Sequence, residues 1–344
     1  LPYLHITKDA KLLGPLEDAA LIETEGRDLF RLIVKKIDQN QLLSDSGIGL
    51  FLVGESKSTE HLVSTAAKSG FACRITDTES FEDGEQIKIV AIWRPFAKAK
   101  KIHQPTVTST STELLSSNWP IGSSLSSDYQ TKGHGRRGRR WDNAGEVFAC
   151  SWKIGKSFEI QPNILQLICG FIVKQSLQQY NQSPHSIQVI QKWPNDILLK
   201  QDDNVGKVCG VLIESISKGN VSETVIGIGI NLSKSENMPV YELQASFADS
   251  LNKEINRQIL QSEIDCRLAR LFDESPNIPK ANFLDFTKLA SKSINEGFTV
   301  PKYLLYRNKN VSFHSVNSEG LVIVCDQKNQ QILCDDGESL KWNF

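Results

Sequence analysis

The alternation of apolar and polar residues predicts a small α/β unit at the start of the chain. Apolar residues recur at helical spacing over 28–38 and 58–69. Short apolar runs predict buried strands at Ile48–Val53, Phe71–Ile75 and Gln86–Trp93. We therefore expect residues 1–103 to form an N-terminal α/β unit, whose role the sequence does not indicate. The prolines and lysines of 94–108 are typical of a linker.

The next region predicts a sheet of antiparallel strands with helices. Val147–Ile154 alternates between apolar and less apolar residues, as a half-buried strand does. Further strands are expected at Ile187–Trp193, Val208–Ile216 and Glu223–Leu232. The pattern fits an antiparallel meander better than a repeated βαβ series. Helical spacing recurs over 163–179, 242–252 and 258–273.

From Gly297 onward the pattern changes to short strands separated by turns. The expected strands are Tyr303–Arg307, Val311–Val316, Leu321–Asp326 and Gln331–Cys334. Such closely spaced strands predict a small β-barrel over 297–344. The whole chain is therefore expected to be an α+β protein with a central antiparallel or mixed sheet.

Composition narrows the class of protein. The chain has 344 residues, 40% of them hydrophobic, and a net charge of −1, which fits a soluble globular protein of two or three domains. The balanced charge and the lack of a helix pair joined by a tight turn argue against a dedicated DNA-binding protein. No apolar run is long enough to span a bilayer. The seven scattered cysteines predict free thiols in a reducing compartment. The chain begins at Leu1 and its single methionine is Met238, so targeting information could lie upstream.

A glycine- and arginine-rich loop over 129–141 carries the clearest candidate chemistry. Gly133, Gly135 and Gly138 alternate with His134, Arg136, Arg137, Arg139 and Arg140. Glycines let backbone amides approach a ligand, and guanidinium groups match carboxylate or phosphate oxygens. We expect this loop to be mobile when empty and ordered by an anionic ligand. A linker, a targeting signal or a nucleic-acid patch would have similar composition. Trp141 and the strand that follows favour a loop that projects from a sheet.

Three other segments offer weaker signals when each is taken alone. The hydroxyl run Thr108–Thr112 precedes Leu114 and Leu115, which is typical of a helix N-cap but also offers small donors to a polar ring. Lys192 ends a strand at the sequence Lys-Trp-Pro-Asn-Asp, where it is either a solvated charge or an anion ligand. Gly227 and Gly229 lack the third glycine and following helix of a dinucleotide site, so they indicate close approach of a flat ligand or a backbone.

Four motifs in this order resemble the biotin–protein ligases, also called holocarboxylase synthetases. The motifs are Gly133–Arg139, Lys192–Asp196, Cys209–Glu214 and Gly227–Asn231. The resemblance covers about residues 105–344, and the hydroxyl run and Asp336–Ser339 are closer to the eukaryotic type. Residues 1–103 do not resemble a winged-helix DNA-binding domain. Two residues depart from the family pattern, since His134 stands where the family has arginine and Cys209 where it has glycine.

The resemblance implies a fold and a reaction. It implies a catalytic domain over 104–296 with a class II aminoacyl-tRNA-synthetase-like sheet, followed by an SH3-like barrel. The implied reaction activates biotin with ATP and Mg²⁺ to biotinyl-5′-AMP and transfers biotin to a lysine of biotin-dependent carboxylases. The partners would be biotin-acceptor domains, with no nucleic acid and no membrane. The protein would be a cytoplasmic monomer or homodimer, with a mitochondrial pool possible.

The resemblance also assigns roles to residues. Arg136 and Lys192 are the expected catalytic residues. The expected biotin-binding residues are Ser109, Thr110, Ser111, Thr112, Gln130, Gly133, His134, Gly135, Arg136, Lys192 and Gly210. The expected ATP-binding residues are Arg136, Arg139, Trp141, Lys192, Asn195 and Asn231. No metal ligand is assigned, although Mg²⁺ entering with ATP is expected near Asp196.

Three alternatives stay open at this point. A lipoate–protein ligase would use the same adenylation chemistry on a related fold. A non-catalytic biotin-sensing regulator would bind biotin without transferring it. A scaffold derived from an enzyme is suggested by His134, but Arg136, Lys192 and Asn231 are all present.

Overall fold

The computed structural model describes residues 4–5, 22–23, 28–54, 57–82, 84–141, 145–155, 160–218, 221–234 and 245–344. The chain divides into two compact units. One unit contains residues 1–98 and 261–281, and the other contains 99–260 and 282–344. All seven cysteines are free, as expected. In the described part of the chain, no helix is both long enough and apolar enough to cross a membrane.

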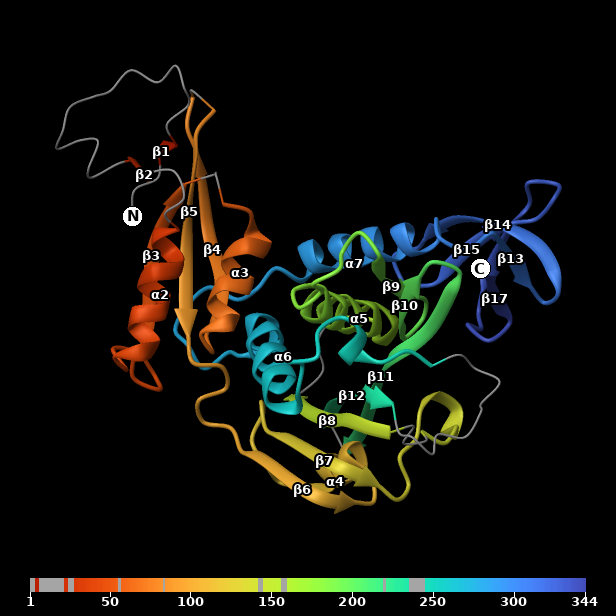
Figure 1. Cartoon of the computed structure of the whole chain (residues 1–344), viewed down its shortest axis with the longest axis horizontal. Coiled ribbons are helices and arrows are strands. Elements are labelled where there is room, and N and C mark those ends of the chain that lie inside the picture. The colour runs from red at the N-terminus through yellow and green to blue at the C-terminus, as the bar shows by residue number, and fades with distance from the viewer. Residues whose placement is uncertain are drawn as a thin grey trace. The chain divides into compact units, whose positions relative to one another are not determined.

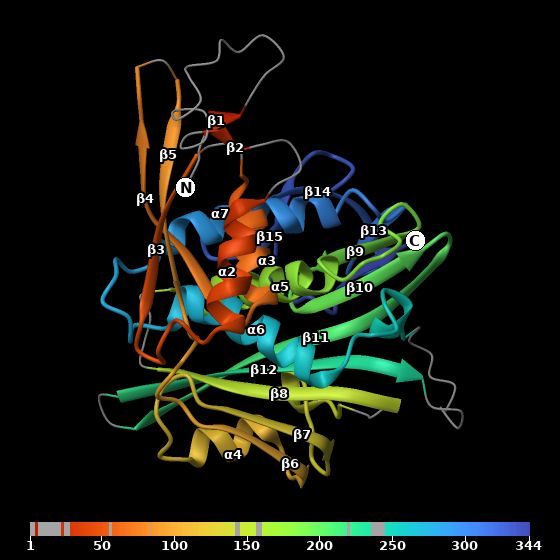
Figure 2. The same cartoon turned by 60° about the vertical axis from the view of Figure 1, so that its left-hand side comes forward.

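The first unit contains a three-stranded antiparallel sheet with two helices on one face (Figures 1 and 2). Its elements are α2 (Leu29–Gln39), β3 (Ile48–Gly54), α3 (Thr59–Lys68), β4 (Ala72–Ser80) and β5 (Gln86–Trp93), after a two-strand pair β1 (Leu4–His5) and β2 (Ile22–Glu23). Asp28 and Ser58 cap the two helices by accepting backbone N–H bonds. The predicted helices and strands are therefore confirmed here.

A distant segment completes this first unit. Asp273, which is buried, follows helix α6 (Arg257–Phe272). Its carboxylate accepts hydrogen bonds from Trp93 Nε1 at 3.0 Å, Phe96 N at 2.7 Å and Ser275 N at 2.9 Å. Arg74 donates to the carbonyls of Arg270, Pro279 and Asp273. Residues 261–281 thus satisfy buried polar groups of the N-terminal strands.

Replacing Asp273 by alanine should destabilise the first unit strongly. The change leaves the Trp93 indole and the Phe96 amide buried without their acceptor, which costs about 3–5 kcal/mol of unfolding free energy. Urea unfolding of the Asp273→Ala protein measures this loss. Asp285→Ala is the matched control, because Asp285 has an exposed side chain. Equal stability of the two variants would contradict the buried role of Asp273.

A seven-stranded mixed sheet forms the centre of the second unit. The strand order is β6-β7-β8-β12-β11-β10-β9, and every neighbouring pair is antiparallel except β6 and β7. The strands are β6 (Lys101–Val107), β7 (Ser124–Gln130), β8 (Gly145–Gly155), β9 (Ile187–Lys192), β10 (Asp196–Gln201), β11 (Asn204–Lys218) and β12 (Val221–Lys234). Figure 2 shows β8, β12 and β11 as long neighbouring strands.

The prediction that residues 94–108 form a linker is wrong for the second half of that range, because Lys101–Val107 forms strand β6. Helix α4 (Thr110–Ser116) connects β6 to its parallel partner β7. Pro105 is tolerated because β6 is an edge strand and Pro105 lies between the paired positions Gln104 and Thr106. Most of β6 is exposed, so its polar composition hid it.

Helices α5 (Pro162–Gln178) and α6 confirm the helices predicted at 163–179 and 258–273. The helix predicted at 242–252 is wrong for the residues of that range that the structure describes. Residues 242–244 lie outside the described residues, and Ala248–Ser250 form only a 3-10 turn. Ala245 and Ser246 are held extended, because they pair with Lys207 on β11. Strand β10 and helix α7 (Phe283–Gly297) were not predicted.

The C-terminal residues form a five-stranded antiparallel sheet within the second unit. Its order is β16-β15-β14-β13-β17, with β13 (Tyr303–Tyr306), β14 (Lys309–Val316), β15 (Val322–Cys325), β16 (Gln331–Cys334) and β17 (Leu340–Asn343). The sequence predicted four of these strands and missed β17. Close approach fixes this sheet to the turn between β9 and β10. A Cβ atom added to Gly337 would lie 2.4 Å from Pro194 Cδ, and Trp193 Nε1 donates to Gly320 O at 3.0 Å.

Candidate active site

A cavity of about 680 Å³ collects most of the predicted site residues in the second unit. Its volume is within the range that ligand pockets usually have. The predicted residues that line it are Ser109, Thr110, Ser111, Gln130, His134, Gly135, Arg136, Arg139, Trp141, Lys192, Asn195, Asp196 and Gly210. Segments far apart in sequence therefore meet at one place on the central sheet.

The hydroxyl run builds one polar end of the cavity. Ser109 caps α4, and Thr110 donates from its backbone N at 2.8 Å and its hydroxyl at 3.1 Å to Gln130 Oε1. Ser151 on β8 lies 2.8 Å from Thr110 Oγ1 and 3.0 Å from Ser111 Oγ. A Cβ atom at position 227 would lie 2.6 Å from Ser111 Oγ, so only glycine lets the helix approach β12 this closely. The result is a compact set of small neutral donors and acceptors.

Three predicted residues lie outside the cavity lining. The Thr112 side chain is exposed on α4. Gly133 packs against the Gln130 side chain, since a Cβ atom added to Gly133 would lie 3.1 Å from Gln130 Nε2. The Gly133 carbonyl accepts a hydrogen bond from Trp141 N at 2.9 Å. Asn231 is buried and donates to the carbonyls of Lys207 at 3.1 Å and Ser246 at 3.3 Å. In this structure Asn231 therefore holds the edge of the site together.

Lys192 and Asp196 are opposite each other because their motif forms the turn of a hairpin. The two residues are Cα partners at the ends of β9 and β10, and the Trp193–Pro194 peptide is cis. Lys207 on β11 forms an ion pair with Asp196 at 2.7 Å. Burial lowers the pKa of Lys192, with further lowering from Lys207 and Arg139 and opposition from Asp196. Such a crowded cation is stabilised by any anion that enters the cavity.

The glycine- and arginine-rich segment is a short hairpin that lies over the cavity. Gly135 N donates to Arg139 O at 2.7 Å, and Trp141 N closes the hairpin on Gly133 O. Gly138 has a φ of 70° at the turn, in the left-handed region that favours glycine. This geometry is compatible with the expectation that ligand orders the loop, which stays a prediction.

Trp141 packs on a pair of glycines at the floor of the cavity. Gly210 and Gly229 are cross-strand partners on β11 and β12. A Cβ atom would lie 3.0 Å from the indole at Gly210 and 2.8 Å from it at Gly229. Lys207 Nζ lies 5.4 Å from the centroid of the same ring. The two glycines therefore create the space that the indole occupies, and at Gly229 this is the close approach of a flat group that the sequence indicated.

The arginines of the loop face two different environments. Burial lowers the pKa of Arg136, to which neighbouring Arg137 also contributes, while Asp336 and Asp196 oppose it. Arg137 lies 3.1 Å from Asp336, and Arg139 lies 2.9 Å from Glu338, in the turn between β16 and β17. The Arg137 and Arg139 side chains are both more than half exposed, so their ion pairs contribute little stabilisation. A more highly charged anion in the cavity could replace the two carboxylates.

At the position where the family pattern has arginine, His134 makes polar contacts with the Glu214 carboxylate and the Lys132 carbonyl. Its Nε2 lies 3.0 Å from Glu214 Oε1 on β11, and its Nδ1 lies 3.2 Å from Lys132 O. The hydrogen bond to Glu214 raises the pKa of His134, although partial burial opposes it. Protonated His134 can therefore hold the loop to the sheet at the position where the family has arginine.

The raised pKa of His134 predicts that a rising pH loosens the loop. The stabilisation is present below the ordinary histidine pKa of 6.5 and is lost as the pH rises through the raised value. Cleavage of the loop by trypsin at its basic residues should accelerate roughly 2- to 5-fold over that rise. A free peptide of residues 129–141 corrects for the pH dependence of trypsin itself. His134→Arg should remove the corrected increase, and an increase that persists in this variant would contradict the assignment.

Sequence reasoning missed several residues that the structure brings to the site. Lys207 sits between the apolar residues Val205 and Val208, and a charge within an apolar strand was the available signal. Asp336 and Glu338 could have been found by matching an acidic turn to a basic loop. Nothing in the sequence indicated that Ser151 would join the hydroxyl cluster, because it lies in an ordinary strand.

Comparisons with known proteins agree with this geometry. A family model described as the biotin/lipoate A/B protein ligase family matches residues 101–231. The chain is 31% identical over 136 residues to the bifunctional ligase/repressor BirA of Escherichia coli. This match covers 37% of this chain and 39% of BirA. The chain is 29% identical over 147 residues to the biotin–protein ligase of Schizosaccharomyces pombe, covering 38% and 23% respectively. The chain thus spans less than half the length of these curated relatives.

A solved structure has the same fold. The biotin protein ligase from Aquifex aeolicus in complex with biotin and ATP superposes with a TM-score of 0.54 at 24% identity, covering 71% of this chain and 99% of that chain. The shared fold is mixed α+β with a central mixed sheet. Residues 101–231 of this chain therefore match the model of the biotin/lipoate A/B protein ligase family, and the chain is similar to the biotin–protein ligases.

Proposed function

We propose that the chain is an ATP-dependent, AMP-forming biotin–protein ligase. The observation that carries the proposal is the composition of the cavity. One end offers neutral hydroxyl and amide groups, and the other gathers the cations Arg136, Arg139, Lys192 and Lys207. A neutral ureido ring joined to a carboxylate, placed beside a triphosphate, matches both ends.

In the first step, a biotin carboxylate oxygen attacks the α-phosphorus of ATP. A P–O bond forms to biotin, the bond to pyrophosphate breaks, and biotinyl-5′-AMP remains. Two anions must approach each other, so positive groups have to lie between them. Arg136 and Lys192 would bridge the carboxylate and the α-phosphate, and they would stabilise the charge of the transition state.

In the second step, the amine of an acceptor lysine attacks the acyl carbon of the mixed anhydride. A C–N bond forms, AMP leaves, and the amine proton passes to solvent or to the phosphate. Closure of the loop would keep water from hydrolysing the anhydride. The acceptors would be biotin-acceptor domains of carboxylases.

The remaining residues would position the two substrates. Gln130, Ser109, Thr110 and Ser111 would hold the ureido ring, with Thr112 supporting the helix start. The backbone from Gly133 to Gly135 and His134 would cover biotin, and Gly210 would shape the biotin site through the Trp141 indole that packs on it. Trp141 would stack on the adenine, with Asn195 shaping the nucleotide site and Asn231 fixing its edge.

Mg²⁺ would enter with ATP. Among the described residues, no group of three or more His, Cys, Asp or Glu side chains could hold a metal ion. Phosphate oxygens and water usually supply most ligands of a nucleotide-bound magnesium ion. Asp196 would be a protein ligand, and its ion pair with Lys207 at 2.7 Å would then have to rearrange. The ion would supply further neutralisation of phosphate charge.

The proposal includes the finer features that the resemblance implies. The central sheet would be of the class II aminoacyl-tRNA-synthetase type, and the C-terminal sheet would close as an SH3-like barrel. The catalytic domain would span 104–296 and the barrel 297–344. The protein would act as a monomer or homodimer in the cytoplasm, with a mitochondrial pool, and without nucleic acid.

Exchange of labelled pyrophosphate into ATP tests the activation step. We expect exchange that depends on biotin and does not occur with lipoate or octanoate. Exchange with lipoate alone would assign the chain to the lipoate ligases of the same family. No exchange with any acid, in folded protein that binds biotin, would identify a biotin-sensing protein or a scaffold.

Neutralising Glu338 should improve the apparent affinity for ATP. Glu338 lies 2.9 Å from Arg139, so its carboxylate competes with phosphate for this guanidinium. A surface ion pair of this kind corresponds to roughly a 2- to 5-fold decrease in KM for ATP in Glu338→Gln. Steady-state kinetics at fixed biotin concentration measures the change. Glu319→Gln, an exposed carboxylate of another C-terminal turn, is the control, and a raised KM in Glu338→Gln would contradict the competition.

A further inference from the structure

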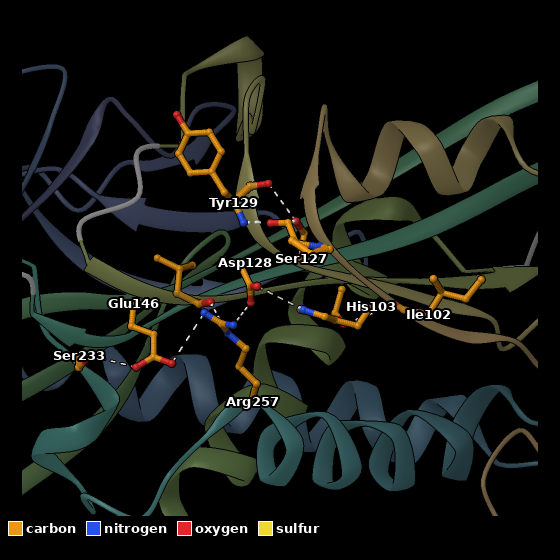
Figure 3. Close-up of polar contacts among 11 residues, drawn as sticks. Ile102, His103, Ser127, Asp128, Tyr129, Glu146, Ser233 and Arg257 are labelled. Atoms are coloured by element: carbon orange, nitrogen blue, oxygen red, sulfur yellow. Dashed lines mark hydrogen bonds and ion pairs between the residues drawn. The ribbon is translucent and has the colours of Figure 1, made fainter.

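A polar cluster outside the cavity surrounds Arg257, the first residue of α6. A cation at a helix N-terminus is opposed by the helix dipole, so this arginine needs compensation from elsewhere. The compensation comes from two strands of the central sheet. Its guanidinium forms an ion pair with Asp128 on β7, lies 3.7 Å from Glu146 on β8, and donates through Nε to Val147 O at 3.1 Å. Figure 3 shows the guanidinium between the two carboxylates.

The contacts lie where β7 and β8 separate. The paired register of these strands ends at Ser127 and Ala149. Asp128 follows Ser127 directly on β7, and Val147 lies two residues beyond Ala149 on β8. Arg257 therefore replaces strand pairing with side-chain contacts at the position where the backbone ladder has ended.

The segment that emerges from this separation is the glycine- and arginine-rich loop. Asp128 comes two residues before Gln130, which binds the hydroxyl cluster through Thr110. Glu146 comes five residues after Trp141, which packs on the glycine floor. A change in the spacing of the two strand ends would therefore move both ends of the loop relative to the cavity.

Neighbouring residues extend the cluster across the sheet. His103 on β6 lies 3.4 Å from Asp128 and 3.1 Å from Ser126 Oγ, and Ser233 on β12 donates to Glu146 at 3.4 Å. Figure 3 shows His103 directed at Asp128 and Ser233 directed at Glu146, the two carboxylates that flank Arg257. Without the guanidinium, Asp128 and Glu146 would lose the cation that they share.

We propose that Arg257 is a positioning residue for the ligase reaction, which fixes the two strand ends that carry the ligand-binding loop. This inference rests on the proposed function. Arg257 does not line the cavity, and it acts through the position of Gln130 at one end of the loop and Trp141 at the other. Its removal makes the loop more mobile and weakens binding of both substrates.

Two readouts on Arg257→Ala test the proposal. Trypsin cleavage within 132–140 of the ligand-free protein should accelerate roughly 3- to 10-fold. The KM for biotin in pyrophosphate exchange should rise by a similar factor, roughly 3- to 10-fold, while kcat changes less. Biotin with ATP should restore protection from trypsin at saturating concentration, because ligand binding reorders the loop.

Matched variants separate positioning from folding. Arg257→Lys keeps the charge and loses the planar fork, so it should give an intermediate cleavage rate and KM. Asp128→Asn should raise the cleavage rate and the KM for biotin. In the Asp128→Asn background, Arg257→Ala should change these two quantities less than it does in the wild type. Arg307→Ala, which removes an exposed arginine paired with Asp335, should leave both unchanged.

The outcomes distinguish this inference from the proposed function. Wild-type cleavage rate and KM in Arg257→Ala would overturn the positioning role, even if exchange with biotin is observed. Faster cleavage together with no exchange in the wild type would keep the link between Arg257 and the loop and reject the ligase. If Arg257→Ala fails to fold, the lysine and Asp128→Asn variants decide by the same two readouts.

Discussion

Lys192→Ala should lower the rate of biotin-dependent pyrophosphate exchange on the order of 10²–10³-fold, the usual effect of removing one donor to a developing anion. Lys192 occupies the end of β9 opposite Asp196, in a cavity that already contains Lys207 and the loop arginines. Lys192 is half-buried, so its favourable interaction with a carboxylate and a phosphate is less screened than at the surface. Arg136→Ala should have an effect of similar size.

A variant of a second lysine and the pH dependence of the exchange rate are the controls for the Lys192→Ala prediction. Lys200→Ala changes a lysine of β10 outside the cavity and should leave the rate unchanged. Burial and the neighbouring Lys207 and Arg139 lower the pKa of Lys192, so activity should fall at a lower pH than for an ordinary lysine. Lys192→Arg should move that fall to higher pH. A Lys192→Ala protein with the wild-type exchange rate would contradict the bridging role.

Gly229→Val should reduce kcat/KM for ATP by roughly 10²-fold, which is the cost expected when a binding group is displaced by about 1 Å. The first added carbon would lie 2.8 Å from Trp141 Cζ2 and 2.9 Å from Cε2, so the indole must move. Because Trp141 ends the loop, its displacement also disturbs the hairpin that carries Arg136 and Arg139.

The mechanism of the Gly229 effect can be isolated. Ile230→Val alters the adjacent buried residue of β12 and should cost only stability, with an unchanged KM for ATP. In a Trp141→Ala background, Gly229→Ala should have little further effect, since the clash has been removed. Additive losses in that double variant would show that Gly229 acts through another contact.

Local sequence patterns predicted much of this site because each motif is a local structure. The sequence Lys-Trp-Pro-Asn-Asp ends a strand, and the structure makes it the turn that sets Lys192 opposite Asp196. The hydroxyl run predicted a helix cap, which Ser109 provides. The resemblance to a family then indicated that these separate segments meet, which periodicity alone does not.

The sequence could not predict features that depend on pairing between distant segments. Strand β6 is mostly exposed and contains Pro105, so its polar pattern is that of a linker until its parallel partner is known. Residues 261–281 pair with buried polar groups of β4 and β5, and no local sequence signal links Asp273 to Trp93. In a chain that begins at residue 104, Asp273 would therefore lose its hydrogen-bond donors Trp93 and Phe96. Arg257 looks like an ordinary helix residue until the sheet places Asp128 and Glu146 beside it.

Transfer of biotin to an acceptor lysine is the measurement that tests the central claim most directly. The protein is incubated with biotin, ATP, Mg²⁺ and an isolated biotin-acceptor domain of a carboxylase, and the intact mass of the acceptor is followed. We predict one biotin on one lysine, formed with an equal amount of AMP, and loss of this product in the Lys192→Ala protein. An acceptor that stays unmodified with biotin, or that is modified with lipoate instead, would contradict the assignment.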